Sequence, residues 1–288
     1  MKRITEVARA AAPPFLRPLG SAALERFRSG HDRLFYERPS RKYREVVAER
    51  ATYPNFQELA GRLIHDGVLI IQDYFGGNRL AALQTEFQRL TVDAPPGHGE
   101  ETNAVHIGTR RIAESELFSG LGLEATFVDF AEYYWGKPVL LTATGGTRLD
   151  PYAADSDYGS YQWHHDAKRK QFRVMILLSD VPAGGQHMDY IAGSHRTFRG
   201  DLRNSRVLPE EIGGANWRVA CNGTAGTIVL FGTNGIHRGN RSLAPRRDHW
   251  QFTYCAPGGR ALQHYPCLAL HPNTLARLTP AQRRIAVF

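Results

Sequence analysis

Apolar side chains recur at helical spacing in the first third of the chain. Within residues 21–66, side chains such as Phe56, Leu59 and Leu63 fall three to four positions apart, which predicts helices. The same spacing predicts a further amphipathic helix over residues 78–90. The first part of the molecule is therefore expected to be helical.

The pattern changes in the rest of the chain. A short β-branched run at 67–71, which begins at a glycine, predicts a strand. After about residue 138, runs rich in Val, Ile, Thr, Phe and Tyr alternate with Gly, Pro, Asp and Asn. Such closely spaced short strands favour a β-sandwich or barrel. The predicted strands are 139–149, 161–166, 172–180, 188–191, 227–231 and 250–255.

A chain of 288 residues is compatible with one large β domain. We predict a single mainly β domain with flanking helices over residues 1–288. Its parts are a helical N-terminal extension (1–66), a barrel core with supporting helices (67–256) and a C-terminal tail (257–288).

Composition narrows the class of protein. No apolar run is long enough to span a bilayer, and the N-terminus lacks the continuous apolar segment of a signal peptide. The three cysteines, Cys221, Cys255 and Cys267, have no CxxC spacing, so we expect free thiols in a reducing compartment. These features predict a cytoplasmic protein with no membrane partner.

The chain is basic, with 36 Lys and Arg against 28 Asp and Glu and a net charge of +8. Much of this charge lies in residues 26–50, which also contain acidic side chains, so a solvated helical face is the simpler interpretation. No nucleic-acid-binding motif accompanies it, and we do not expect a nucleic-acid partner.

The segment Tyr-Gln-Trp-His-His-Asp contains a candidate metal site. On the predicted strand, His164 and Asp166 share one face and His165 points to the other. His237 is the best third ligand, because the buried-looking strand before it delivers it to a turn. Two histidines and one carboxylate are the ligand set of non-haem Fe(II) oxygenases. On these residues alone, an ordinary hydrogen-bonded His–Asp pair remains the alternative.

Two arginines, Arg246 and Arg247, follow His237 just before the predicted strand 250–255. In the 2-oxoglutarate-dependent class of such oxygenases, the distal carboxylate of the co-substrate needs a fixed cation, and a guanidinium suits it. The large apolar residues of the strand 250–255 are even-numbered. If this apolar face points into the barrel, Arg246 shares its parity and Arg247 does not. We therefore expect Arg246 to be the anchor and Arg247 to be its solvated or substrate-facing neighbour.

Ordered sequence blocks across residues 66–256 resemble the phytanoyl-CoA dioxygenase-like family of Fe(II)/2-oxoglutarate oxygenases. The blocks are DGVLIIQDYF from residue 66, WHHD from 163, LLSDV from 177, GGQ from 184, IAGSH from 191 and HRGNRS with PRR from 237. The second block has His165 where the family often has Gln.

The resemblance implies a double-stranded β-helix, or jelly-roll barrel, with helices packed on it. It implies Fe(II), 2-oxoglutarate and O2 as cofactor and co-substrates. His164, Asp166 and His237 would be the iron ligands and Arg246 the 2-oxoglutarate anchor, with Arg247 and the polar Thr147 as further co-substrate contacts. Family halogenases lack the carboxylate of the triad, so its presence favours hydroxylation or a related desaturation or cyclisation.

Other polar residues have simpler interpretations. Ser194 and His195 are expected in a capped turn, and His187 is expected to be a satisfied core histidine. The loops 93–108, 150–160 and 198–216 are long enough to form lids over a site.

We expect a small, anionic or carrier-linked biosynthetic metabolite as substrate, because basic residues follow the HxD motif. Three alternatives remain open. They are an oxygenase of nucleic acid or protein, a metal-dependent cupin-like isomerase or lyase, and a non-catalytic barrel used for binding.

Overall fold

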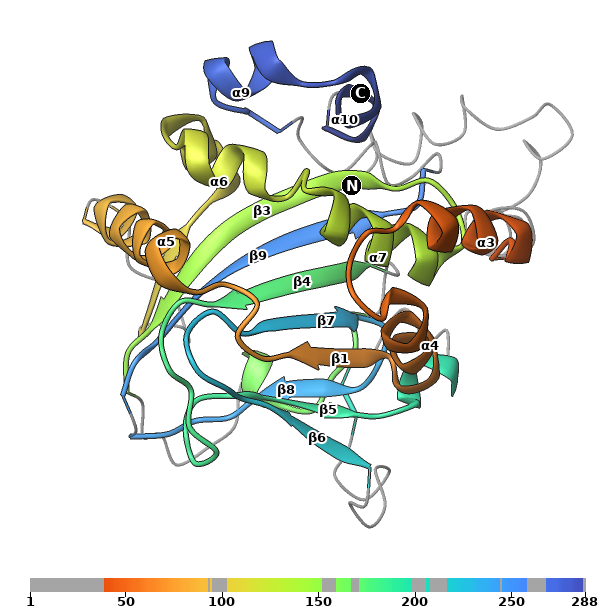
Figure 1. The fold of residues 1–288 in the computed structure, drawn as a ribbon. Helices are drawn as coiled ribbons and strands as arrows, with labels where there is room; N and C mark the ends of the chain where they lie inside the picture. Colours follow the sequence, from red (N-terminus) through yellow and green to blue (C-terminus); the bar gives the residue numbers. More distant parts are fainter. Residues whose placement is uncertain are drawn as a thin grey trace, which may run out of the picture.

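The computed structural model describes residues 39–92, 94, 103–151, 159–166, 171–197, 206–207, 217–243, 245–257 and 268–286. Within these ranges the strands pair antiparallel in two sheets (Figure 1). The large sheet is ordered β1 (Val68–Ile71), β7 (Ile228–Gly232), β4 (Phe172–Leu177), β9 (Arg247–Cys255), β3 (Leu140–Leu149) and β2 (Ala104–Ile107). The small sheet is ordered β6 (Arg218–Cys221), β5 (Met188–Ile191) and β8 (His237–Gly239).

Helices cover one face of the large sheet (Figure 1). They are α3 (Arg41–Arg50), α4 (Phe56–Asp66), α5 (Gly77–Thr91), α6 (Glu116–Leu121), α7 (Ala125–Trp135), α9 (Pro272–Arg277) and α10 (Pro280–Ala286). Short 3-10 helices lie between these elements, at Thr109–Glu114, Gly159–Tyr161 and Ser194–Thr197. Helix α4 ends at Gly67, whose φ of 79° lies in the left-handed region that glycine adopts most easily. The chain therefore turns directly from α4 into β1.

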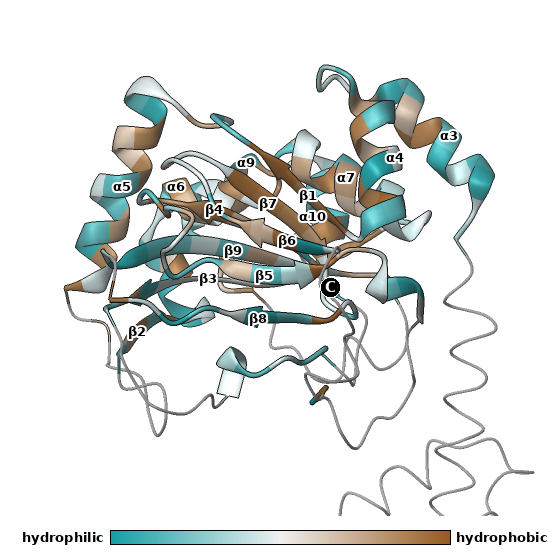
Figure 2. Cartoon of the chain, turned by 90° about the horizontal axis from the view of Figure 1, so that it is seen from below, coloured by the Kyte–Doolittle hydropathy of each residue, from teal (hydrophilic) through white to brown (hydrophobic). Residues whose placement is uncertain are grey.

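The opposite face of the large sheet, here called the inner face, is turned toward the small sheet. A second apolar cluster lies between the sheets and includes Met175, Val229 and Phe231 of the large sheet with Tyr190 and Cys221 of the small one. Both faces of the large sheet are thus covered, and Figure 2 shows its strands β1, β7 and β4 as largely apolar. A sheet covered on both faces has apolar residues at both parities.

Strand β9 shows how the two faces differ. Its even-numbered side chains pack against the helices: the Trp250 ring stacks on Phe118 with 3.7 Å between centroids, and Phe252 lies 5.9 Å from Phe127. The indole N–H of Trp250 donates to the Thr144 hydroxyl at 2.8 Å. The odd-numbered residues of β9 therefore belong to the inner face.

The predicted class, a mainly β jelly-roll with helices packed on one side, is confirmed, although the two sheets do not close into a barrel within the described residues. The strands predicted at 67–71, 139–149, 188–191 and 227–231 and the helix at 78–90 agree with β1, β3, β5, β7 and α5 to within one residue at each end. The strand predicted at 172–180 ends at Leu177, and β9 begins three residues before its predicted start.

The strand predicted at 161–166 is wrong as a continuous element. Gly159–Tyr161 forms a 3-10 turn, and only His164 makes ladder bridges. Strands β2, β6 and β8 and helices α6 and α7 were not predicted. The first 38 residues, most of the three predicted lid loops and Cys267 lie outside the described residues, whereas Cys221 and Cys255 are buried and form no disulfide among the described residues. Among the helices that the structure describes, none combines the length and apolar character that a membrane span requires.

Candidate metal centre

The structure brings His164, Asp166 and His237 together. One potential ligand atom from each residue lies within 4.8 Å of the others. His237 is the first residue of β8, and the other two lie on the segment that runs beside it. Among the described residues no other group of three or more His, Cys, Asp or Glu side chains meets this distance.

Backbone hydrogen bonds fix these three residues relative to one another. The N–H of His164 donates to the carbonyl of His237 at 2.9 Å, and the N–H of His237 donates back to His164 at 2.8 Å. The N–H of Asp166 donates to the carbonyl of Thr233 at 2.9 Å. These three hydrogen bonds place the HxD segment beside β8.

The histidine tautomers are set by carbonyl groups. Nδ1 of His164 lies 2.7 Å from the Gln162 carbonyl oxygen, and Nδ1 of His237 lies 2.8 Å from that of Gly235. A carbonyl oxygen only accepts, so each Nδ1 carries the proton and donates. In a neutral imidazole this leaves the lone pair on Nε2, and such an outer hydrogen bond is the usual companion of a metal-binding histidine.

The protonation states also suit a cation. Burial lowers the pKa of His237 to about 4, and the neighbouring charge of His164 acts in the same direction. Burial likewise lowers the pKa of His164. For Asp166 burial opposes ionisation, but Arg173, whose guanidinium lies 3.1 Å away, and the two histidines outweigh it and lower the pKa. The residues therefore offer two neutral imidazoles and one carboxylate at neutral pH.

Aromatic rings hold His237 in place. The Tyr190 ring stacks on it at 6.3 Å and 15°, and Phe231 lies edge-on at 5.7 Å. The Tyr190 hydroxyl donates to the Gly232 carbonyl at 2.9 Å. A Cβ on Gly235 would lie 1.8 Å from this hydroxyl, so the turn before His237 requires glycine.

The predicted parity of the arginine is wrong. Arg246 precedes β9 and is exposed, whereas Arg247 is 8% exposed and its guanidinium donates to the carbonyl of Gln186, just before β5. Burial lowers the pKa of Arg247 to about 10. The apolar face of β9 points at the helices, so the arginine of odd parity is the one that enters the space between the sheets.

Further polar side chains line the inner face near Arg247. Thr147 of β3 lies directly opposite His249 of β9, and both are buried. The Thr147 hydroxyl lies 3.3 Å from Nδ1 of His106 on β2. Thr147 was predicted from the sequence, but His249 and His106 were not. Their signal was the alternation Arg247-x-His249, which points to the inner face once the parity is known.

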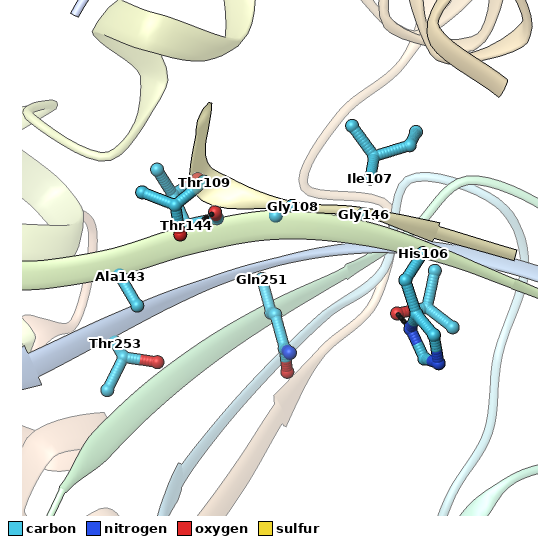
Figure 3. A pocket seen from close by; sticks show the side chains of 11 residues that line it. His106, Ile107, Gly108, Thr109, Ala143, Thr144, Gly146, Gln251 and Thr253 are labelled. Carbon is cyan, nitrogen blue, oxygen red and sulfur yellow. Dashed lines mark hydrogen bonds between the residues drawn. The ribbon is translucent and has the colours of Figure 1, made fainter. Parts of the chain in front are cut away.

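A pocket of about 200 Å³ opens at this wall, where β2 ends against β3. Figure 3 shows His106, Gln251 and Thr253 projecting to the same side of the sheet. Thr253 lies directly opposite Arg173, the residue that contacts Asp166. Arg173 of β4 therefore links the pocket, through Thr253 of β9, to the metal-binding residue Asp166.

Comparison with known families identifies the class. The model of the phytanoyl-CoA dioxygenase (PhyH) family matches residues 64–247, more than half of the chain. The chain belongs to the phytanoyl-CoA dioxygenase family. The resemblance noted in the sequence is thus confirmed, and the family places this chain among the iron- and 2-oxoglutarate-dependent oxygenases.

Relatives of this PhyH-family chain include two ectoine dioxygenases. The one from Sphingopyxis alaskensis is 24% identical over 256 residues, which are 76% of this chain and 82% of the relative. The one from Stutzerimonas stutzeri is 23% identical and covers 67% and 74%. Among solved structures, EctD from S. alaskensis with bound Fe has a TM-score of 0.57 at 20% identity, covering 72% and 78%. The 2-oxoglutarate-dependent epimerase SnoN of nogalamycin biosynthesis has the same TM-score and identity, covering 73% and 89%. These likenesses agree on the fold.

Three other polar residues of this PhyH-family chain have structural contacts. The Ser194 hydroxyl donates to the Ile191 carbonyl at 2.6 Å and accepts the Ile236 N–H at 2.8 Å, as expected of a capped turn. A ring nitrogen of His195 lies 3.1 Å from a carbonyl of α4, and His187 contacts Asp189 at 3.2 Å. The interpretation of these residues as structural is confirmed.

Proposed function

We propose that this protein is an Fe(II)- and 2-oxoglutarate-dependent dioxygenase that hydroxylates a C–H bond of a small metabolite. The observation that carries the proposal is the convergence of one potential ligand atom from each of His164, Asp166 and His237 within 4.8 Å. This ligand set leaves open positions on one side of a bound metal. Arg247 adds a buried guanidinium on the inner face of β9.

His164, Asp166 and His237 would hold the iron. Their fit rests on the tautomers, because both Nδ1 atoms donate to carbonyl oxygens and both Nε2 atoms remain available. When bound, iron and 2-oxoglutarate would supply oxidation by dioxygen, with succinate and carbon dioxide as co-products. The protein would contribute orientation of the reacting C–H bond and exclusion of water.

Arg247 would anchor the distal carboxylate of 2-oxoglutarate, with Thr147 beside it. The Nε atom of Arg247 is buried without a hydrogen-bond partner among the described residues, although another of its nitrogens donates to Gln186. A buried guanidinium with an unused donor is suited to a carboxylate, which it can bind through two parallel hydrogen bonds. This role replaces the one expected for Arg246.

The inner face favours a small anionic substrate. The pocket is lined by histidine, threonine, glutamine and glycine residues together with Ile107 and Ala143, and none of its lining residues is a carboxylate. Arg173 lies opposite Thr253 at its edge. The basic residues at 168–170, which supported the same expectation, lie outside the described residues. Ectoine dioxygenases are relatives, so a small biosynthetic metabolite is the substrate class that we propose.

The test is a turnover assay with Fe(II), 2-oxoglutarate and a panel of small carboxylate and phosphate metabolites, read as succinate release. Labelled dioxygen and product mass then define the reaction. Hydroxylation adds one oxygen atom from dioxygen, cyclisation or desaturation removes two hydrogen atoms, and epimerisation leaves the mass unchanged. Asp166→Ala is the matched inactive variant. Product formation that persists without 2-oxoglutarate and oxygen would contradict the proposal and favour a metal-dependent isomerase.

A further inference from the structure

His249 is a buried histidine with a ring nitrogen that no described residue satisfies. It lies on the inner face of β9, directly opposite Thr147 on β3 and Leu177 on β4. It is 6% exposed, and its Nδ1 atom has no hydrogen-bond partner among the described residues. The next inner-face residue toward the start of β9 is Arg247, whose Nε atom is also buried without a hydrogen-bond partner among the described residues.

Two other histidines each reach a backbone carbonyl through one ring nitrogen, although Nδ1 of His195 is also buried without a hydrogen-bond partner among the described residues. His187 and His195 each place a ring nitrogen about 3 Å from a backbone carbonyl oxygen, at 3.0 and 3.1 Å. A buried polar group without a partner is costly, and native proteins rarely keep one without a reason such as a ligand. Two such groups at adjacent inner-face positions of one strand, His249 and Arg247, indicate a shared ligand.

The surroundings select the chemistry of that ligand. Burial lowers the pKa of His249 well below its ordinary value, and the positive charge of Arg247 acts in the same direction. The ring is therefore neutral and keeps one N–H donor. A group that accepts hydrogen bonds and carries negative charge complements this wall, and a carboxylate does both.

We infer that His249 is a second hydrogen-bond donor, beside Arg247, to the distal carboxylate of the 2-oxo acid co-substrate. The inference rests on the proposed function and deepens it, because it adds a positioning residue to the co-substrate site. His249 lies on the inner face between Arg247 and Gln251, and Thr147 lies opposite it. Arg247 supplies the charge, and His249 with Thr147 fixes the direction from which the carboxylate is held.

The test measures binding rather than turnover. Fe(II)-loaded protein is titrated without oxygen, following the visible charge-transfer band of the iron–2-oxo acid chelate. Two ligands are compared: 2-oxoglutarate, and 2-oxopentanoate, in which a methyl group replaces the distal carboxylate. The variants are His249→Leu, which removes the donor at similar volume, and His249→Gln, which retains an N–H. Arg246→Leu is the matched control, because that side chain is exposed.

We expect His249→Leu to weaken 2-oxoglutarate binding about 10- to 100-fold, the range for a lost hydrogen bond to a charged group. Binding of 2-oxopentanoate should change less than about threefold, because it lacks the carboxylate. His249→Gln should recover part of the loss, and Arg246→Leu should match the parent.

Equal weakening of both ligands in both His249 variants would show a structural role and overturn the inference, as would no weakening of either. In those cases a band in the parent protein would leave the proposed function intact. Absence of the band from folded, iron-loaded parent protein would overturn both.

Discussion

Acid should destabilise the metal-free protein through His237 in particular. This residue is 5% exposed, and burial holds its pKa at about 4. In the unfolded chain a histidine titrates near ~6.5, so the unfolded state binds the proton more readily. Because the folded pKa is depressed, the contribution to stability is complete above about pH 6.5 and is lost as the pH falls toward about 4.

The size of the effect follows from the displaced pKa. For each pH unit below the pKa of His237 in the unfolded chain, the free energy of unfolding falls by about 1.4 kcal/mol, until the pKa of the folded state is reached. At about pH 5 the loss from His237 alone is therefore about 2 kcal/mol. For a chain of this length such a loss lowers the melting temperature by about 3 °C. His164, whose pKa is also lowered by burial, adds to the loss in the same direction.

The assay is urea unfolding of chelator-treated protein at about pH 7.5 and about pH 5, for the parent and for His237→Gln. Glutamine does not titrate, so the difference in unfolding free energy between the two proteins should change by about 2 kcal/mol between these conditions. Titrating groups away from His237 are common to both proteins and cancel, whereas His164 and Asp166 interact with His237 and contribute to the measured difference. If the two proteins lose stability in parallel, to within about 0.5 kcal/mol, His237 is not held neutral by burial and the electrostatic account of the site is wrong.

Two further predictions concern packing around the site. Gly235→Ala should destabilise the fold by about 1–3 kcal/mol and weaken metal binding, because a Cβ there would lie 1.8 Å from the Tyr190 hydroxyl; thermal unfolding and metal titration check this, and an unchanged melting temperature would contradict it. Arg148→Gln should lower the free energy of unfolding in urea by about 3–5 kcal/mol. It leaves Asp248, which is 4% exposed and paired with Arg148 at 2.8 Å, as an uncompensated buried charge. Adding Asp248→Asn should recover much of the loss, and no recovery would show that the pair is not the cause.

The metal-binding residues could be predicted from the sequence because their geometry is local. His164 and Asp166 need only an extended backbone to share a face, and this holds although the predicted strand around them is reduced to one bridge. His237 could be found because β7 is a recognisable buried strand that leads to it. The short β8 that it begins could not, since three residues carry too little pattern.

The inner face of β9 could not be predicted from its apolar pattern. Trp250 and Phe252 were expected to face the barrel interior, but they pack against helices α6 and α7. Strand periodicity gives the alternation but not which face is covered by which layer. Helices α6 and α7 were not recognised in the sequence, so nothing indicated that the apolar side of β9 belonged to them. The polar side, with Arg247 and His249, is the one that faces the site.

The most direct test of the central claim is the stepwise addition of Fe(II) and then 2-oxoglutarate to metal-free protein without oxygen. The account predicts a visible charge-transfer band in the parent that His237→Ala abolishes. Arg247→Ala should need far more 2-oxoglutarate to develop it, whereas Arg246→Ala should behave as the parent does. A folded, iron-loaded parent protein that gives no band, or a band that depends on Arg246 and not on Arg247, would contradict it.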